Sequence, residues 1–338
     1  MRSPTQRSLS VADIQDILGS PILDLGSPVL DAAELSGGGF AAVWRAKLVD
    51  GREVVVKVGP PATARLLAYE AGLIRREAEY FRLVADHAPV PAVLAASDDW
   101  IVTTLLPGHP LTSGDSPRAR AQLGAVVAGI HTLTGPHFGY ISDPAPLSGP
   151  RDASRLGHIS LPGHASGPTG ERASGRDWPT AFLAMVAALR ADAAAWDVPL
   201  PPLDGLVERH TGVLAEVTRP ALLHFDLWDG NVLVGQSGEL TGLVDGERYL
   251  YGDPLLDLVS PALFRRIEDS PDHPFLLGYG LTRFDRSARI RLALYRLHLY
   301  VLMLAESPSR GIGHDRHDRV TRLLCAEIEH LASFGHRD

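Results

Sequence analysis

The chain has 338 residues, of which 45% are hydrophobic and 21% charged, and its formal net charge at pH 7 is −8. This length is large for one hydrophobic core and suggests two lobes. The negative charge argues against nucleic acid or an anionic membrane as the main partner. A single cysteine, Cys325, excludes an internal disulfide framework and a multi-cysteine zinc site. We therefore expect a protein of the reducing cytoplasm.

The first third of the chain predicts an antiparallel sheet with one helix. Residues 29–58 alternate between apolar runs and turns, and Asp50-Gly51 between two such runs is a strong hairpin signal. Apolar residues at helical spacing predict a helix over 63–85. Two short strands are expected at 92–96 and 100–106, and Pro107-Gly108 ends the second. We place a lobe boundary there, between residues 1–106 and 107–338.

The remainder predicts a mainly helical lobe, so the expected fold class is α+β. One segment, 143–177, is rich in Gly, Pro and Ser without periodicity, which is typical of a functional or disordered loop. The most apolar long segment, 290–305, carries Arg291, Arg296 and His298, and is too short and too charged to span a bilayer. Helices are expected at 119–134, 178–196, 255–266, 287–307 and 317–334.

One short segment carries the main functional signal. Asp226 follows His224 by two residues, Asn231 follows Asp226 by five, and Asp245 comes after one hairpin. Phosphoryl transfer from ATP needs a carboxylate to orient and deprotonate a hydroxyl, and an Asn and an Asp to hold Mg²⁺. A plain Asp-Gly turn would explain Asp229-Gly230 but not the joint spacing. The segment therefore predicts a kinase that uses ATP and Mg²⁺.

A glycine-rich stretch precedes the second expected strand. Ser36-Gly37-Gly38-Gly39 begins a G-x-G-x-x-A pattern, which would also suit a dinucleotide site or a simple turn. A dinucleotide site needs a helix directly after the glycines, whereas a strand is expected here, so a loop that covers phosphates is favoured.

The chain has two lysines, Lys47 and Lys57, and neither follows a glycine, which excludes a Walker A loop. Lys57 lies on the third strand, where kinases keep the lysine that binds the α- and β-phosphates. We expect Glu77 to be its carboxylate partner, with Glu70 and Glu79 as rivals.

These residues resemble known kinase motifs. His224 to Asn231 is similar to the kinase H-x-D-L-x-x-x-N loop. Residues 222–234, with Gly242-Leu243-Val244-Asp245 and the run from Gly252 to Asp257, resemble the aminoglycoside phosphotransferase family. The Leu227-Trp228-x-Gly230-Asn231 variant is similar to the fructosamine kinases of the same superfamily. The resemblance implies a two-lobed protein-kinase-like fold and a small-molecule hydroxyl as acceptor.

The resemblance also implies roles for individual residues. Asp226 is the expected catalytic base, Asn231 and Asp245 the magnesium ligands, and Lys57 the partner of Glu77. The main chain near Thr104 and Leu106 is expected to contact the adenine, and Asp253 to support the catalytic loop. From the residues themselves, we expect His224 to brace that loop by hydrogen bonds. Glu247 and Trp228 are candidate substrate contacts, with packing as the favoured alternative for Trp228.

Two departures from the family pattern stand out. Phe225 occupies a position that is usually glycine, and Asp245-Gly246-Glu247 replaces Asp-Phe-Gly. Because an Ala-Pro-Glu segment is also absent from the sequence, a protein substrate is not expected.

Three hypotheses for the function remain open, and the first two differ in the charge of the acceptor. An aminoglycoside-type antibiotic or related amino sugar, with a role in antibiotic resistance, is the first. A fructosamine, ketoamine or other sugar metabolite is the second, and a regulatory pseudokinase the third. A polycation needs an acidic pocket, for which the candidates, interspersed with arginines, are Glu247, Asp257, Glu268, Asp269 and Asp272.

Overall fold

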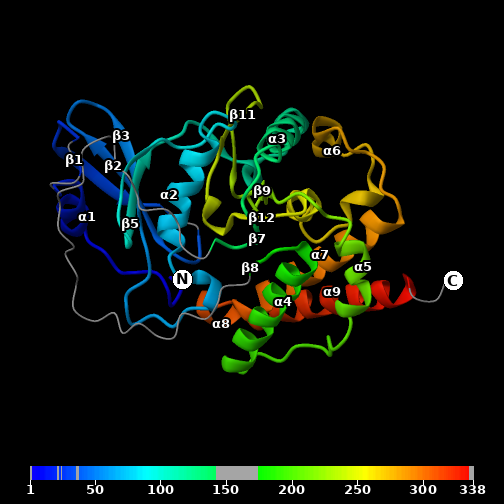
Figure 1. Cartoon of the computed structure of the whole chain (residues 1–338). Helices are drawn as coiled ribbons and strands as arrows, with labels where there is room; N and C mark the ends of the chain where they lie inside the picture. Colours follow the sequence, from blue (N-terminus) through cyan, green and yellow to red (C-terminus); the bar gives the residue numbers. More distant parts are fainter. Residues whose placement is uncertain (1, 21–22, 24, 36–37, 142–173, 335–338) are drawn as a thin grey trace.

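The computed structural model describes residues 2–20, 23, 25–35, 38–141 and 174–334. It has the expected α+β, two-lobed, protein-kinase-like architecture, with an antiparallel sheet at one end and a mainly helical region at the other (Figure 1). Most of the loop expected at 143–177, together with Ser36 and Gly37, lies outside the described residues. The division at residue 106 stays a prediction.

The first lobe is built on a five-stranded sheet of order β1-β2-β3-β5-β4. Its strands confirm the expected pattern, and Gly51 turns the β2–β3 hairpin with a positive φ of 87°. The elements are α1 (Val11–Leu18), β1 (Val29–Glu34), β2 (Ala42–Leu48), β3 (Glu53–Val58), α2 (Leu73–Val84), β4 (Val93–Ala96) and β5 (Trp100–Thr104).

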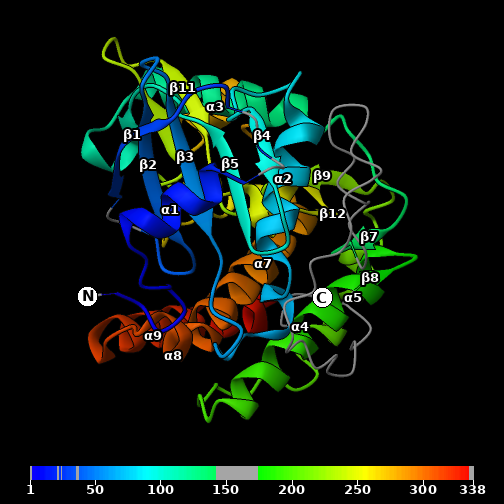
Figure 2. The same cartoon turned by 90° about the vertical axis from the view of Figure 1, so that its left-hand side faces the viewer.

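The two faces of this sheet are covered differently. Ile14 and Leu18 of α1, a helix not expected from the sequence, pack with Val56 and Val58 of β3 in one apolar cluster. Side chains alternate between the faces of a strand, so Lys57 lies on the opposite face, where α2 packs (Figure 2). Strand periodicity thus aims the lysine at α2.

The helix expected over 63–85 is shorter than predicted. A 3₁₀ turn covers Ala68–Glu70 and α2 begins only at Leu73, because Gly72 at its start has a φ of 73° in the left-handed region. The strand expected at 100–106 similarly ends at Thr104.

The second lobe places two small sheets beside long helices. One sheet has the order β11-β10-β6 and the other β8-β7-β12-β9. Their strands are β6 (His109–Pro110), β7 (Phe138–Gly139), β8 (Ser174–Gly175), β9 (Ala221–Leu223), β10 (Val232–Val234), β11 (Leu240–Leu243) and β12 (Leu250–Gly252). The helices are α3 (Pro117–Ile130), α4 (Trp178–Ala195), α5 (Thr211–Leu214), α6 (Pro274–Tyr279), α7 (Arg286–Ala305), α8 (Ser307–Arg310) and α9 (His314–Ser333).

Helix α7 forms the centre of this lobe, as expected of a core helix. Every residue from 292 to 302 is buried, and the charge of Arg296 is neutralised by Glu268 at 2.7 Å and Glu327 at 3.1 Å. Within the described residues no helix combines the length and apolar character needed to cross a bilayer.

The helix expected at 255–266 is not an α-helix. Only a 3₁₀ segment, Pro254–Leu258, forms there. Pro261 follows soon after, and a proline disfavours helical geometry at the residue before it and lacks the N–H that would continue the helix.

Candidate active site

Lys57 lies at the centre of a buried charge cluster between the lobes. Its Nζ is 2.7 Å from Glu77 Oε2, 2.8 Å from Asp245 Oδ1 and 3.2 Å from Glu247 Oε2. The structure thus places Glu77 against the lysine. Of its two rivals, Glu70 pairs with Arg310 and Glu79 lies beside Tyr249.

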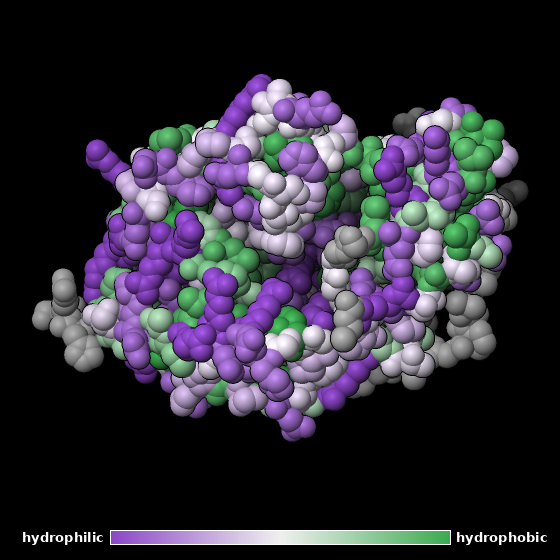
Figure 3. All heavy atoms as spheres, turned by 180° about the vertical axis from the view of Figure 1, so that it is seen from behind, coloured by the Kyte–Doolittle hydropathy of each residue, from purple (hydrophilic) through white to green (hydrophobic). Residues whose placement is uncertain are grey.

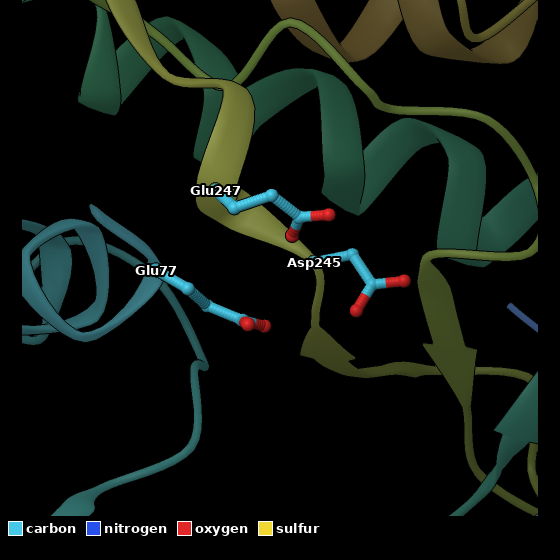
Figure 4. Close-up of side chains that lie close together, drawn as sticks. All are labelled: Glu77, Asp245 and Glu247. Carbon is cyan, nitrogen blue, oxygen red and sulfur yellow. The ribbon is translucent and has the colours of Figure 1, made fainter. Parts of the chain in front are cut away.

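The three carboxylates of this cluster point toward one another from two elements (Figure 4). One oxygen from each of Glu77, Asp245 and Glu247 lies within 4.8 Å of the others. Burial disfavours the ammonium form of Lys57, yet these carboxylates outweigh it and raise its pKa well above the usual value. Burial raises the pKa of Glu77 to about 8, although Lys57 opposes this effect. One ammonium therefore does not satisfy three carboxylates.

This charge imbalance fits a divalent cation. Mg²⁺ prefers carboxylate and amide oxygens and keeps part of its water shell. The amide nitrogen of Asn231 donates to the main-chain oxygen of Asp226 at 2.9 Å, so the side-chain oxygen of Asn231 is the atom left to act as a ligand. Asp245 supplies a carboxylate whose pKa stays below its usual value, because Lys57 outweighs the effect of burial. The oxygen donors of Asn231 and Asp245 are of the kind that Mg²⁺ prefers, and their role as its ligands stays a prediction.

Asp226 lies on the loop between β9 and β10, where its side chain is 20% exposed. Burial raises its pKa, whereas the guanidinium of Arg248 acts in the opposite direction. Arg248 Nε lies 3.8 Å from Asp226 Oδ2, and its NH2 group lies 2.8 Å from Glu306 Oε1. Arg248 was not among the predicted site residues.

The imidazole of His224 makes two hydrogen bonds to the main chain, one within this loop and one just after β11, while its role as a support stays a prediction. Its Nδ1 accepts a hydrogen bond from the Asp226 N–H at 3.2 Å, so Nε2 is the nitrogen that donates to the main-chain oxygen of Val244 at 3.2 Å. The ring is fully buried and meets Tyr80 of α2 edge-on, with the centroids 5.2 Å apart. This imidazole links the catalytic loop to the residue before Asp245.

Asp257 is a buried carboxylate that accepts hydrogen bonds from the loop between β9 and β10. It accepts the main-chain N–H groups of His224 at 2.9 Å and Phe225 at 2.6 Å, and contacts His131 Nε2 at 3.0 Å. The expected support, Asp253, instead contacts Arg291 and Tyr295 of α7, both at 2.6 Å. Any action of Asp253 on the loop is therefore indirect.

Both departures from the family pattern have a structural explanation. Phe225 has a φ of 65°, in the left-handed region that favours glycine. This conformation costs roughly 1–2 kcal/mol for a residue with a β carbon. Burial of its ring against His298, at 5.3 Å between centroids, offsets that cost. Beside Asp245, a β carbon on Gly246 would lie 2.1 Å from the Tyr80 ring, so Tyr80 occupies the space of a side chain there.

The buried His298 makes stability depend on pH. Burial lowers its pKa to about 3, and neither ring nitrogen has a hydrogen-bond partner among the described residues. Below the usual histidine pKa of about 6.5, His298 becomes protonated in the unfolded chain but stays neutral in the folded chain, so the free energy of unfolding falls as the pH falls. We expect this site to cost up to about 1.4 kcal/mol of unfolding free energy per pH unit as the pH falls below that value. His298→Leu should remove this dependence in urea unfolding at pH 7.5, 6.5 and 5.5.

The control for this prediction is His314→Gln, at an exposed position of α9, which should keep the wild-type dependence. Equal loss of stability on acidification in wild type and His298→Leu would contradict the role of this histidine.

Two segments are predicted from the sequence to contact the nucleotide, the glycine-rich stretch before β2 and the chain after β5. Gly38 has a φ of 77°, and Gly39 follows it toward β2. The Thr104 N–H is bonded to the main-chain oxygen of Ala92 at 3.0 Å, whereas no hydrogen bond of the described chain involves the Leu106 main chain. A contact with adenine stays a prediction for both residues.

Trp228 and Glu247, the tentative substrate contacts, lie in different surroundings. Glu247 is buried against Lys57 and belongs to the charge cluster. Trp228 is 39% exposed and lines a pocket of about 580 Å³ next to the catalytic loop, together with Asp229 and Arg120, which are ion-paired at 2.7 Å. Figure 3 shows a hollow with hydrophilic surroundings near the centre of the back face.

A profile of the phosphotransferase enzyme family (APH) matches residues 31–292. The chain belongs to this family. It is therefore a small-molecule kinase, an enzyme that transfers a phosphoryl group to a hydroxyl. No curated protein matches the sequence.

Solved structures with the same fold include several kinases of small molecules. A candidate fructosamine-3-kinase from Thermobifida fusca YX-ER1 is 23% identical with a TM-score of 0.61, over 94% of this chain and 99% of that one. A second one, from Haemophilus somnus 129PT, is 15% identical with a TM-score of 0.62, over 89% and 92%. A thermostable mutant of aminoglycoside phosphotransferase APH(4)-Ia, in a ternary complex with AMP-PNP and hygromycin B, is 18% identical with a TM-score of 0.56, over 94% and 98%. At these identities the likeness concerns the fold.

Proposed function

We propose that this enzyme transfers the γ-phosphoryl group of ATP to a hydroxyl of a sugar-type small molecule that carries at most one positive charge. The observation that carries the ATP part is the contact of Lys57 with Glu77 and Asp245, at 2.7 and 2.8 Å. A strand lysine held between a helix carboxylate and a metal-binding aspartate is the arrangement that protein-kinase-like enzymes use on nucleotide phosphates. The complex of the APH(4)-Ia mutant with AMP-PNP supports the same nucleotide class.

In this proposal the site residues divide into three groups. Lys57 holds the α- and β-phosphates under the glycine loop, and Leu106 meets the adenine. Asn231 and Asp245 bind Mg²⁺, which supplies charge neutralisation for the phosphates when it is bound. Asp226 accepts a hydrogen bond from the acceptor hydroxyl, orients it for in-line transfer and removes its proton.

Four of the five acids expected to be able to bind a polycation are already engaged within the chain, whereas the fifth, Asp272, is exposed. Glu247 contacts Lys57, and Asp257 holds the catalytic loop. Glu268 pairs with Arg296 at 2.7 Å, and Asp269 pairs with Arg289 at 2.9 Å. Because these four carboxylates already have partners within the chain, they are less able to bind the amino groups of a polycationic aminoglycoside.

Cations also lie beside the reacting groups. Arg248 lies 3.8 Å from Asp226. The charged residues that line the pocket beside Trp228 include three arginines and two aspartates: Arg120, Arg265, Arg266, Asp115 and Asp229. A ketoamine or neutral sugar meets less electrostatic repulsion there than a polyamine does. The exposed indole of Trp228 offers an apolar face on which a sugar ring could pack.

The test is a phosphorylation screen with purified enzyme, ATP and Mg²⁺. The acceptors are a fructosamine-modified amino acid, neutral sugars and hygromycin B, and mass spectrometry detects addition of a phosphoryl group. We expect turnover of a neutral or singly charged acceptor, abolished by EDTA. Efficient phosphorylation of hygromycin B alone would establish the aminoglycoside alternative, and ATP binding without transfer to any acceptor would favour a regulatory module.

We also propose that the enzyme is cytoplasmic, because its single cysteine, Cys325, suits a reducing compartment.

A further inference from the structure

Arg310 of α8 is a buried arginine from the C-terminal lobe that reaches the glycine loop of the other lobe. Its guanidinium carbon lies 5.0 Å from the centroid of the Phe40 ring. A β carbon on Gly39 would lie 3.0 Å from Arg310 Cδ, so the arginine stem lies directly against the loop. The side chain is only 8% exposed. The side chain of Arg310 thus brings the C-terminal lobe into contact with Gly39 and Phe40.

Two buried carboxylates fix the position of Arg310. Glu70, from the 3₁₀ turn before α2, pairs with its NH2 group, and Glu306 lies 3.7 Å from the same group. Glu306 also holds Arg248, the arginine beside Asp226, at 2.8 Å. A planar guanidinium can stack on a ring and bind carboxylates at the same time, which a lysine ammonium cannot do equally well.

The N-terminal segment holds the same loop from another side. The hydroxyls of Ser3 and Thr5 donate to the main-chain oxygen of Gly39 at 2.6 and 2.9 Å, and Gln6 Nε2 donates to that of Ala41 at 3.1 Å. Pro4 lies 3.5 Å from the position of a β carbon on Gly311, at the end of α8. Figures 1 and 2 both show this segment passing α8 before it reaches α1. Gly39 and Phe40 therefore contact α8 directly, through Arg310, and are also linked to its end through the N-terminal segment.

We propose that Arg310 is a positioning residue for ATP: by stacking on Phe40 while Glu70 and Glu306 anchor it, it fixes Gly39 and Phe40 at the end of the glycine loop that leads into β2, next to the expected position of the nucleotide phosphates. This inference rests on the proposed ATP-dependent function. Holding Gly39 and Phe40 in place raises affinity for the phosphates because the cost of ordering them is met before ATP arrives. The alternative is that the buried ion pairs only stabilise the fold.

Binding of two ligands to the full-length protein separates these possibilities. Calorimetry with AMP-PNP and Mg²⁺ reports contacts to the phosphates, whereas adenosine reports contacts to the base alone. We expect Arg310→Gln to weaken AMP-PNP binding roughly tenfold, the size of a desolvated cation–π contact, with adenosine binding unchanged. In turnover assays KM for ATP should rise while kcat stays within about threefold of wild type, as for a contact made equally in ground and transition states.

Two further variants provide controls. Arg310→Lys keeps the charge but not the planar group, and should recover part of the lost affinity. Arg322→Gln changes an exposed arginine of α9 and should behave as wild type. If Arg310→Gln does not fold, Phe40→Leu tests the other side of the contact, with the same selective loss expected for AMP-PNP.

The outcomes are distinguishable from failure of the proposed function. Wild-type protein that binds no AMP-PNP would overturn both proposals. Wild-type binding with an unchanged AMP-PNP affinity in Arg310→Gln, or in Phe40→Leu if the arginine variant does not fold, would overturn the role of Arg310 alone. Equal loss of AMP-PNP and adenosine affinity would likewise show that Arg310 serves only the fold.

Discussion

Asp226→Asn should lower kcat by roughly 10²- to 10⁴-fold, the usual contribution of a positioned general base, and leave the affinity for ATP within about twofold of wild type. The amide keeps the shape of the carboxylate but cannot take the proton of the acceptor hydroxyl. Steady-state kinetics with the acceptor found in the screen, together with AMP-PNP binding, provide the measurement.

The geometry predicts this separation between turnover and binding. Lys57, which would hold the phosphates, contacts Glu77 and Asp245 but not Asp226. Asp204→Asn, which changes an aspartate whose side chain is 83% exposed, serves as control and should keep wild-type kinetics. Retention of more than about a tenth of the wild-type kcat by Asp226→Asn would rule out general-base catalysis at this position.

Local sequence patterns predicted the sheet better than the helices. The strands of residues 29–58 alternate regularly and are separated by glycine turns, so their pattern already determines both faces. The helix expected at 63–85 was too long. Apolar residues have helical spacing on both sides of Gly72, but the left-handed conformation of this glycine interrupts the helix, and α2 begins only after it. At 255–266 the expected helix is replaced by a 3₁₀ segment, Pro254–Leu258, and Asp257 within it accepts the main-chain N–H groups of His224 and Phe225.

The candidate site shows the same limit. The spacing of His224, Asp226, Asn231 and Asp245 depends on one loop and one hairpin, so it was visible in the sequence. The choice among three helix acids for Lys57 depends on how α2 packs on the sheet, which no local pattern contains. Glu306 pairs with Arg248, which lies 58 residues before it (306 − 248), and Arg310 pairs with Glu70 of the other lobe. Their roles are tertiary, and in the sequence they resemble ordinary surface arginines.

Asp257 did leave a signal that could have been used differently. It interrupts the apolar run from Leu255 to Leu258, and a charge in such a run is rarely buried without partners. It was considered as an acid for binding a cationic acceptor, whereas the structure buries it completely under the catalytic loop.

Asp257→Ala should therefore be among the most damaging substitutions outside the reacting groups. It would leave the N–H groups of His224 and Phe225 and a ring nitrogen of His131 without their acceptor in a buried region. Each unsatisfied group costs about 1–3 kcal/mol, so we expect a loss of at least about 3 kcal/mol in the free energy of unfolding. Urea denaturation measures this loss, and Asp269→Asn, at a more exposed acid nearby, should change stability by less than about 0.5 kcal/mol.

Asp257→Asn separates the support of the loop from the support of the fold. An amide retains one acceptor oxygen, but its NH₂ group would face a backbone N–H that now has no acceptor. Phe225 holds its left-handed conformation only while the surrounding structure enforces it, and the N–H of Phe225 has the shortest of the three contacts, 2.6 Å. Loss of that contact should let the residue relax and displace Asp226, lowering kcat at least about tenfold with little change in AMP-PNP affinity. A stable Asp257→Asn protein with wild-type kcat would show that burial of Phe225 against His298 is sufficient to hold the catalytic loop.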